Sequence, residues 1–246
     1  MPSATASAAP PLTVVLVHGA FADASGWNDV IERLLARGLR VIAPANPLRG
    51  ISIDSAYIAG VLKDVSGHVL AVGHSYGGAV ITNAATYAEN VVGLVYVAGF
   101  APNEGERLID AESVSKDSVL NSALVPLRYP IGQGSETAVE FAIDAAKFHN
   151  AFAADLPAEQ TAVMAATQRP VAELAFSEPS GMPAWKNLPS WTVVATGDTA
   201  AGADVIRSMA ERAGATITEV KGSHVIMMSQ PQAVTDVIQS AIAAVT

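Results

Sequence analysis

The 246-residue sequence contains no cysteine, and charged residues make up only 15% of it. Without cysteine the chain can form no disulfide bond, no thiolate nucleophile and no cysteine-ligated metal site. The low charge, together with 50% hydrophobic residues, argues against intrinsic disorder. A chain of this length typically folds as one domain and buries about 70–75% of the surface of its unfolded state.

Positive charge is scarce too, with 14 Lys and Arg against 23 Asp and Glu and a net charge of −9. We therefore expect neither nucleic acid nor an anionic membrane as a partner. No apolar run approaches the ~18 residues of a membrane span, and the most apolar stretch, residues 91–101, holds two glycines. Residues 1–11, MPSATASAAPP, lack the basic and apolar regions of a signal peptide. We expect these residues to form a flexible tail. We also favour a cytoplasmic location for the protein, and a homodimer is a possible assembly.

Apolar runs alternate with helical patterns over two parts of the chain. The runs that predict strands lie at residues 14–17, 40–43, 69–72, 91–97, 191–196 and 216–220. Apolar residues at helical spacing predict helices at residues 26–37, 53–65, 76–88, 203–213 and 231–245. Alternation of this kind predicts an α/β fold with a doubly wound, mostly parallel sheet covered by helices on both faces.

Residues 102–189 interrupt this alternation. Prolines divide them into short helical pieces, and no strand is evident there. An insertion of this size between two strands of one sheet is expected to form a helical cap over the carboxyl edge of the sheet, where ligands bind in open α/β folds. We therefore predict a core of residues 12–101 and 190–246 and a cap of residues 102–189.

The segment Gly73-His74-Ser75-Tyr76-Gly77 matches the pattern G-x-S-x-G. It follows an expected strand and opens an expected helix, which is the context of a nucleophile elbow. Ser75 is therefore the candidate nucleophile. The alternatives are a Gly/Ser turn without chemistry and a phosphate-binding turn.

A serine hydroxyl needs a base, and the base needs a group that fixes its tautomer. Of the five histidines, His224 alone lies in the loop between the last strand and the last helix, at the carboxyl edge. Asp198 follows the strand at 191–196 and is the candidate acid, although it could instead cap the next helix, and Glu104 is its rival. The chain order is nucleophile, acid, base, which is one of three common triad orders.

The oxygen of a tetrahedral intermediate needs N–H donors. We expect these from Tyr76, directly after the candidate nucleophile, and from Ala20 in the turn His18-Gly19-Ala20-Phe21, with Phe21 as the alternative to Ala20. The candidates for the pocket lining are Phe21, Phe100, Phe148, Phe152 and Trp185, with Tyr76, Phe141, Met164 and Phe176 as further possibilities. Most of these side chains should be ordinary core. Because cations are few among them, the pocket predicts a small, neutral, fairly apolar substrate.

The segments VVLVHGAFADASGW, GHSYGG, ATGDTA and GSHVIMMSQP resemble the α/β-hydrolase superfamily, in particular the esterase branch that contains plant methylesterases, hydroxynitrile lyases and bacterial relatives. The resemblance covers residues 12–245. It implies hydrolysis of carboxylic esters by Ser75, His224 and Asp198, with no cofactor or metal and with a helical cap over the pocket. It disfavours lyase chemistry, because Gly19 and Val225 stand where lyases of this branch typically carry threonine and lysine.

Other enzyme classes lack their motifs here. A serine at the elbow, in place of aspartate, argues against haloalkane dehalogenases and epoxide hydrolases. The sequence contains no Tyr-x-x-x-Lys, G-x-G-x-x-G, P-loop or H-E-x-x-H pattern, which removes support for nucleotide and metal chemistry. The remaining alternative is a non-catalytic protein that binds a small molecule on the same fold.

Overall fold

The computed structural model describes residues 11–246, and residues 1–10 of the expected tail lie outside this part. Its main sheet has six strands in the order β2-β1-β3-β4-β8-β9, and every neighbouring pair is parallel. The strands are β1 (Leu12–Val17), β2 (Arg40–Ile42), β3 (His68–His74), β4 (Val91–Val97), β8 (Ser190–Ala195) and β9 (Thr216–Val220). The predicted parallel sheet is confirmed.

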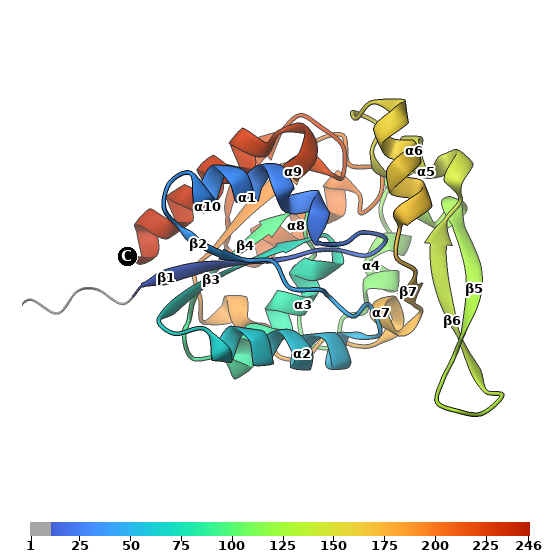
Figure 1. The fold of residues 1–246 in the computed structure, drawn as a ribbon, viewed down its shortest axis with the longest axis horizontal. Helices are drawn as coiled ribbons and strands as arrows, with labels where there is room; N and C mark the ends of the chain where they lie inside the picture. Colours follow the sequence, from blue (N-terminus) through green and yellow to red (C-terminus); the bar gives the residue numbers. More distant parts are fainter. Residues whose placement is uncertain (1–10) are drawn as a thin grey trace, which may run out of the picture.

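Helices cover both faces of this sheet, which explains why its inner strands are mostly apolar and almost wholly buried. Figure 1 shows α1 (Asn28–Leu35) and α10 (Pro231–Val245) on one face and α2 (Ile51–Asp64) and α3 (Tyr76–Ala84) on the other. Helix α8 (Ala203–Arg212) packs against β8 and β9. Three shorter helices are η1 (Ala24–Trp27), η2 (Ala85–Tyr87), which extends α3, and α9 (Ile226–Ser229). None of the helices in the described residues is long and apolar enough to cross a membrane.

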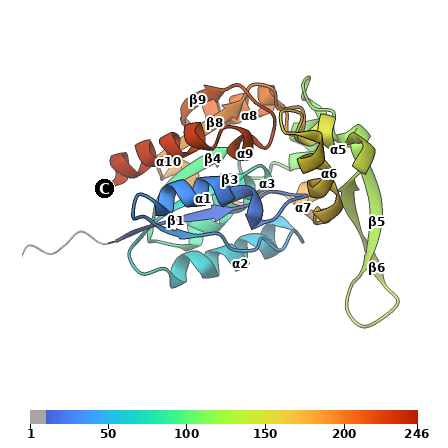
Figure 2. The same cartoon turned by 45° about the horizontal axis from the view of Figure 1, so that its top comes forward.

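The chain between β4 and β8 forms the inserted segment. It contains α4 (Leu108–Ser113), η3 (Leu120–Ala123), β5 (Leu124–Pro130), β6 (Thr137–Ile143), α5 (Ala145–Phe152), α6 (Ala158–Thr167), β7 (Val171–Ala172), α7 (Leu174–Ser177) and η4 (Ala184–Lys186). Strands β5, β6 and β7 make a second, antiparallel sheet. Figures 1 and 2 show the segment at the carboxyl ends of the main strands, with the β5–β6 hairpin projecting outward.

The expectation of a purely helical cap is wrong, because this segment also contains a sheet. Strand β5 includes Pro126 and Pro130, which argued against a strand. Proline lacks the N–H of a strand ladder, but an edge strand tolerates it, and β5 is the edge of its sheet. The strand is also largely exposed, so it lacks the apolar alternation that marks a half-buried strand. The domain boundaries at residues 101 and 190 stay a prediction.

The strand register brings the candidate residues to one edge. Val17 pairs with Gly73, His74 with Val97, and Ala195 with Val220. The loops after β1, β3, β8 and β9 therefore leave the sheet side by side, at the carboxyl edge where open α/β sheets place their ligands.

Candidate active site

Ser75 lies in a sharp turn between β3 and α3. Its backbone has φ 52° and ψ −126°, a sparsely populated conformation for a non-glycine residue that costs about 1–3 kcal/mol. Its N–H donates to the Val97 carbonyl at 3.3 Å, and its carbonyl accepts from the Phe100 N–H at 3.1 Å. Gly77 is required nearby, because a Cβ at this position would collide with the Val17 carbonyl. This is the strained geometry expected of a nucleophile elbow.

His224 and Asp198 meet in the interior, although 26 residues separate them in the sequence. The Nδ1 atom of His224 lies 2.7 Å from Oδ2 of Asp198, and the side chains are only 2% and 1% exposed. In the neutral ring, Nδ1–H donates to the carboxylate and Nε2 keeps its lone pair. The pair thus has the geometry of a base and the acid that orients it.

The other oxygen of Asp198 stabilises its own loop. Oδ1 accepts from the N–H groups of Ala200 and Ala201 at 2.9 and 3.0 Å. The capping role that the sequence offered as an alternative therefore coexists with the bond to His224. Glu104, the rival acid, is exposed.

The structure does not complete the relay from serine to histidine. Within residues 11–246 the Ser75 hydroxyl forms no hydrogen bond, to His224 or to any other group. The two loops nevertheless touch, because Nε2 of His74 lies 3.0 Å from the main-chain oxygen of His224 and the two rings are 4.7 Å apart between centroids. Bonds of this kind are often long in unliganded enzymes and tighten when substrate binds.

The turn after β1 packs directly against the elbow. A Cβ at Gly19 would lie 2.6 Å from Cβ of Ser75, so only glycine allows this approach. The N–H of Asn46 donates to Nε2 of His18 at 2.9 Å, which leaves the proton of this ring on Nδ1, 2.9 Å from the Gly19 carbonyl. Burial lowers the pKa of His18 and favours this neutral form.

The bond from His18 orients the candidate oxyanion donor. Because a peptide unit is planar and trans, holding the Gly19 carbonyl on one side directs the Ala20 N–H to the opposite side. Tyr76, the second candidate donor, is the first residue of α3, where the N–H has no partner within the helix. The sequence placed His18 in this turn, before Gly19, but gave it no role, and Asn46 was not singled out.

The Tyr76 side chain is anchored away from the elbow. Its hydroxyl donates to Oδ2 of Asp54 at 2.7 Å, inside the protein. Burial raises the pKa of Asp54, and burial together with the nearby Asp54 carboxyl raises the pKa of Tyr76 well above its ordinary value. Asp54 also accepts from the N–H of Arg49, so this buried pair ties the start of α3 to the start of α2. Sequence reasoning missed Asp54.

An aromatic cluster, built mostly from the inserted segment, contacts His224 through Phe152. The Phe152 ring lies 5.0 Å from that of His224 and packs edge-on to Phe21 at 6.2 Å. Phe176 stacks on Phe21 at 6.3 Å, and Phe148 packs on Phe152 at 5.1 Å. Of the five residues selected for the pocket, Phe21, Phe148 and Phe152 therefore share one cluster.

The other two selected residues lie in different surroundings. Phe100 is buried and meets the elbow through its N–H. Trp185 donates from its indole N–H to the Pro102 carbonyl at 3.1 Å. Neither ring packs on the aromatic cluster within the part of the chain that the structure describes.

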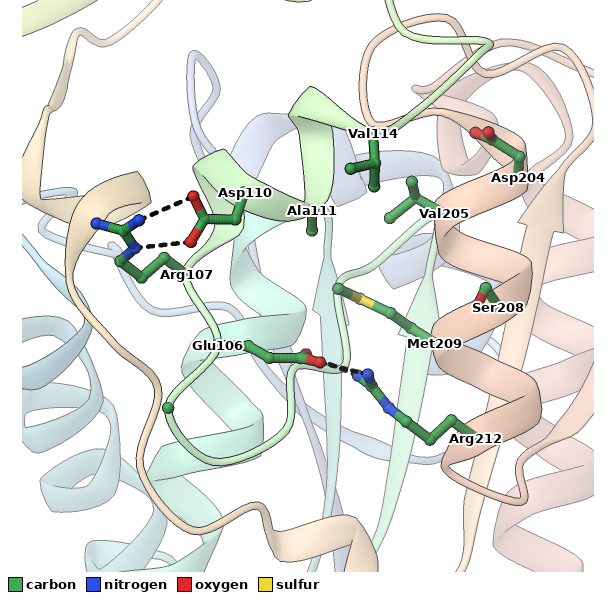
Figure 3. Close-up of a pocket in the computed structure, with 11 residues that line it drawn as sticks. Glu106, Arg107, Asp110, Ala111, Val114, Asp204, Val205, Ser208, Met209 and Arg212 are labelled. Carbon is green, nitrogen blue, oxygen red and sulfur yellow. Dashed lines mark hydrogen bonds and ion pairs between the residues drawn. The ribbon is translucent and has the colours of Figure 1, made fainter.

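A groove at the surface is separate from these residues. A groove of about 520 Å³ runs between α4 and α8, with Ala111, Val114 and Met209 among its apolar residues (Figure 3). Ion pairs between Arg107 and Asp110 and between Arg212 and Glu106 flank it. Ser75 is only 6% exposed and does not line this groove. Within residues 11–246 no group of three or more His, Asp or Glu side chains could hold a metal ion.

Comparisons with known proteins agree with this architecture. A carbendazim hydrolyzing esterase from Nocardioides sp. (strain SG-4G) is 34% identical over 108 residues, which cover 39% of this chain and 45% of that enzyme. The match thus spans less than half the length of this relative. The crystal structure of polyneuridine aldehyde esterase superposes with a TM-score of 0.79 at 18% identity, covering 94% of this chain and 99% of that one. A pyrethroid hydrolase from Sphingobium faniae JZ-2 superposes with a TM-score of 0.75 at 21% identity, covering 95% and 98%.

The likeness to these solved structures shows the shared fold. A family model described as alpha/beta hydrolase family matches residues 14–237, which is most of the chain and includes the elbow, the candidate acid and the candidate base. The chain therefore belongs to the alpha/beta hydrolase family.

Proposed function

We propose that this protein hydrolyses carboxylic esters through an acyl-enzyme formed on Ser75. The observation that carries the proposal is the buried hydrogen bond of 2.7 Å between His224 and Asp198. The loop of His224 touches the strained turn that carries Ser75. The esterase similar over part of the chain and the esterase of like fold support the same reaction class.

In the first half of the reaction, Oγ of Ser75 attacks the ester carbonyl carbon and its proton passes to Nε2 of His224. Asp198 stabilises the imidazolium that forms and keeps the proton of Nδ1 in place. The oxygen of the tetrahedral intermediate accepts from the N–H groups of Ala20 and Tyr76. Removing one such donor typically costs 10²–10³ in kcat. The C–O bond to the alcohol then breaks, and His224 returns its proton to the leaving oxygen.

In the second half, water replaces the alcohol. Nε2 of His224 takes a proton from the water as its oxygen attacks the acyl carbon, and the bond to Ser75 breaks as the serine regains a proton. The products are one alcohol and one carboxylic acid. These steps use side chains and main-chain N–H groups of this chain together with water.

The surroundings of His224 favour a small, neutral, fairly apolar ester. Phe152 lies next to the base, and Phe21 and Phe176 extend the aromatic cluster from it. Burial of apolar groups against such rings favours binding. Ser75 and His224 are both buried, so neighbouring side chains must move to admit a substrate.

The proposal is tested with p-nitrophenyl esters of increasing acyl length and with a fluorophosphonate probe read by intact mass. We expect turnover of short acyl esters and one probe adduct per chain on Ser75, with Ser75→Ala as the unreactive control. A preference for charged or long lipid-like acyl groups would overturn the substrate class. A folded protein that neither hydrolyses any ester nor takes up the probe would instead be the non-catalytic binding protein.

A further inference from the structure

His74 directly precedes the candidate nucleophile and contacts the main chain of the candidate base. It ends strand β3 and is fully buried. Its Nε2 lies 3.0 Å from the main-chain oxygen of His224. A carbonyl oxygen can only accept, so Nε2 of His74 carries a proton and donates it. The turn that presents the nucleophile is thus hydrogen-bonded to the main chain of the residue that would deprotonate it.

The second nitrogen of His74 shows that its ring is neutral. Nδ1 is buried, and among the described residues it has no hydrogen-bond partner. A protonated Nδ1 would be an unpaired buried donor on a cation, which is costly. Burial lowers the pKa of His74 well below its ordinary value, and the nearby His224 and His18 act in the same direction.

Neutrality matters because of the neighbouring ring. The centroids of His74 and His224 are 4.7 Å apart, and acyl transfer makes His224 a cation. If His74 were also an imidazolium, the two positive charges would repel at this distance and disfavour protonation of His224. A neutral donor holds the main chain of His224 without this penalty.

The space around His74 admits little movement. The indole of Trp27 packs edge-on to its ring at 6.3 Å between centroids. Gly19 is close as well, because a Cβ at this position would lie 3.1 Å from Nδ1 of His74. The ring therefore fills the volume between the turn that carries Ala20 and the loop that carries His224.

Three side chains hold that loop, in addition to the N–H of Gly197, which donates to the Gly222 carbonyl at 2.9 Å. Asp198 binds the ring of His224. Asp155 of the inserted segment accepts from the N–H of Ser223 at 2.8 Å and from the Ser223 hydroxyl. The contact from His74 is the one that comes from the elbow itself, so it relates the position of the base to that of Ser75.

We propose, on the basis of the proposed function, that His74 is a positioning residue whose neutral Nε2–H sets the separation between the Ser75 hydroxyl and the imidazole of His224. A role as a second base does not fit the geometry. Its Nε2 proton is held by a carbonyl, and its free Nδ1 lies against Gly19.

The test compares four variants of the full chain. His74→Leu removes the donor and keeps an apolar side chain. In His74→Gln the amide reaches about as far as Nε2 and can donate to the same carbonyl, whereas the amide of His74→Asn is shorter. His68→Gln makes the same chemical change at the other end of β3 and serves as the matched control. Each variant is measured for kcat and KM on p-nitrophenyl acetate, for the rate of phosphonate labelling, and for melting temperature.

We expect His74→Leu to lower kcat and the labelling rate about 10–100-fold, since a misplacement near 1 Å can cost about 10², with KM changed less than about threefold. His74→Gln should recover most of this loss, His74→Asn should not, and His68→Gln should match the wild type. If His74→Leu does not fold, the test rests on whether His74→Gln has a higher kcat and labelling rate than His74→Asn. A His74→Leu variant that melts lower but keeps its kcat would show a merely structural role and overturn the proposal.

A readout without turnover separates this proposal from the proposed function. The proton between His224 and Asp198 should give a far-downfield proton NMR signal, and nitrogen shifts should report His74 as neutral with the proton on Nε2. We expect His74→Leu to shift or broaden the downfield signal and His74→Gln to preserve it. If the wild type hydrolyses no ester and this pattern still appears, the proposed function fails while the positioning role stands. If esters are hydrolysed and His74→Leu changes neither kcat nor the signal, the positioning role fails alone.

Discussion

At the scale of single residues, the proposed chemistry depends on one proton moving from Ser75 to His224. We predict that Ser75→Ala and His224→Ala each lower kcat at least about 10³-fold, since such pairs act as a unit. Steady-state kinetics on p-nitrophenyl acetate checks this, with circular dichroism to confirm the fold. Residual turnover near the wild-type level in a folded Ser75→Ala variant would remove this serine from the mechanism.

Asp198 holds the tautomer of His224 in this scheme. We predict that Asp198→Asn lowers kcat by about 10²–10⁴, because an amide can present its NH₂ to Nδ1 and favour the wrong tautomer. Glu104→Gln is the matched control, and we expect wild-type kinetics from it because Glu104 is exposed. If instead Glu104→Gln loses activity and Asp198→Asn keeps it, the acid role belongs to Glu104.

Glu112 of α4 is a buried acid that the proposed mechanism does not use. Its side chain is 5% exposed, and its Oε1 has no hydrogen-bond partner in the described part of the chain. Burial, with the negative charge of Asp198, raises the pKa of Glu112 from 4.5 to about 8. Glu112 is not among the residues that line the groove of Figure 3, although its neighbour Ala111 is. We infer that Glu112 is uncharged in the folded protein at neutral pH.

This raised pKa predicts a stability that depends on pH. Between pH 4.5 and about 8 the folded chain keeps the Glu112 proton while the unfolded chain releases it, so the free energy of unfolding falls as pH rises through this window. Each pKa unit corresponds to about 1.4 kcal/mol. Glu112→Gln is uncharged at every pH and should therefore be more stable than the wild type near pH 8, by up to a few kcal/mol.

Urea unfolding of both proteins at pH 4, 6 and 8 checks this prediction. The two midpoints should nearly coincide at pH 4 and separate progressively toward pH 8. A constant difference between the two midpoints across the three pH values would mean that the pKa of Glu112 is the same in the folded and unfolded states.

At the scale of elements, the β5–β6 hairpin is largely at the surface of the inserted segment. Its strands are largely exposed or half-buried, and its turn, residues 131–136, is exposed throughout. By contrast, α5 supplies Phe152 to the surroundings of His224. The helical parts of the segment therefore contact the site, while the hairpin tip projects into solvent (Figure 2).

We predict that replacing residues 132–135 with Asn-Gly, a two-residue hairpin turn, leaves the rest of the molecule intact. Exposed changes usually alter stability by less than about 0.5 kcal/mol, so the melting temperature should shift by about 2 °C at most. Scanning calorimetry and kcat/KM on p-nitrophenyl acetate check both. A large loss of activity with an unchanged melting temperature would show that the hairpin takes part in substrate binding.

At the scale of the whole molecule, the sequence predicted the parallel sheet, the helices on its two faces and the ends of most elements to within a few residues. It also selected Asp198 and His224, which the structure joins by a hydrogen bond, and placed Ser75 in a turn whose strain is now evident. Their catalytic roles stay predictions. These successes share a cause, because apolar periodicity and glycine spacing are local signals that record which face of an element is buried.

What the tertiary structure alone decided is the set of partners between distant segments. The sheet in the inserted segment was missed because an exposed edge strand leaves a weak pattern and tolerates proline. The neutral rings of His18 and His74, the acid form of Glu112 and the anchor from Asp54 to Tyr76 could not be predicted. Their protonation depends on burial and on hydrogen-bond directions that exist only after the chain has packed. The sequence by itself determined which side chains reach the carboxyl edge, and packing decided what each of them binds there.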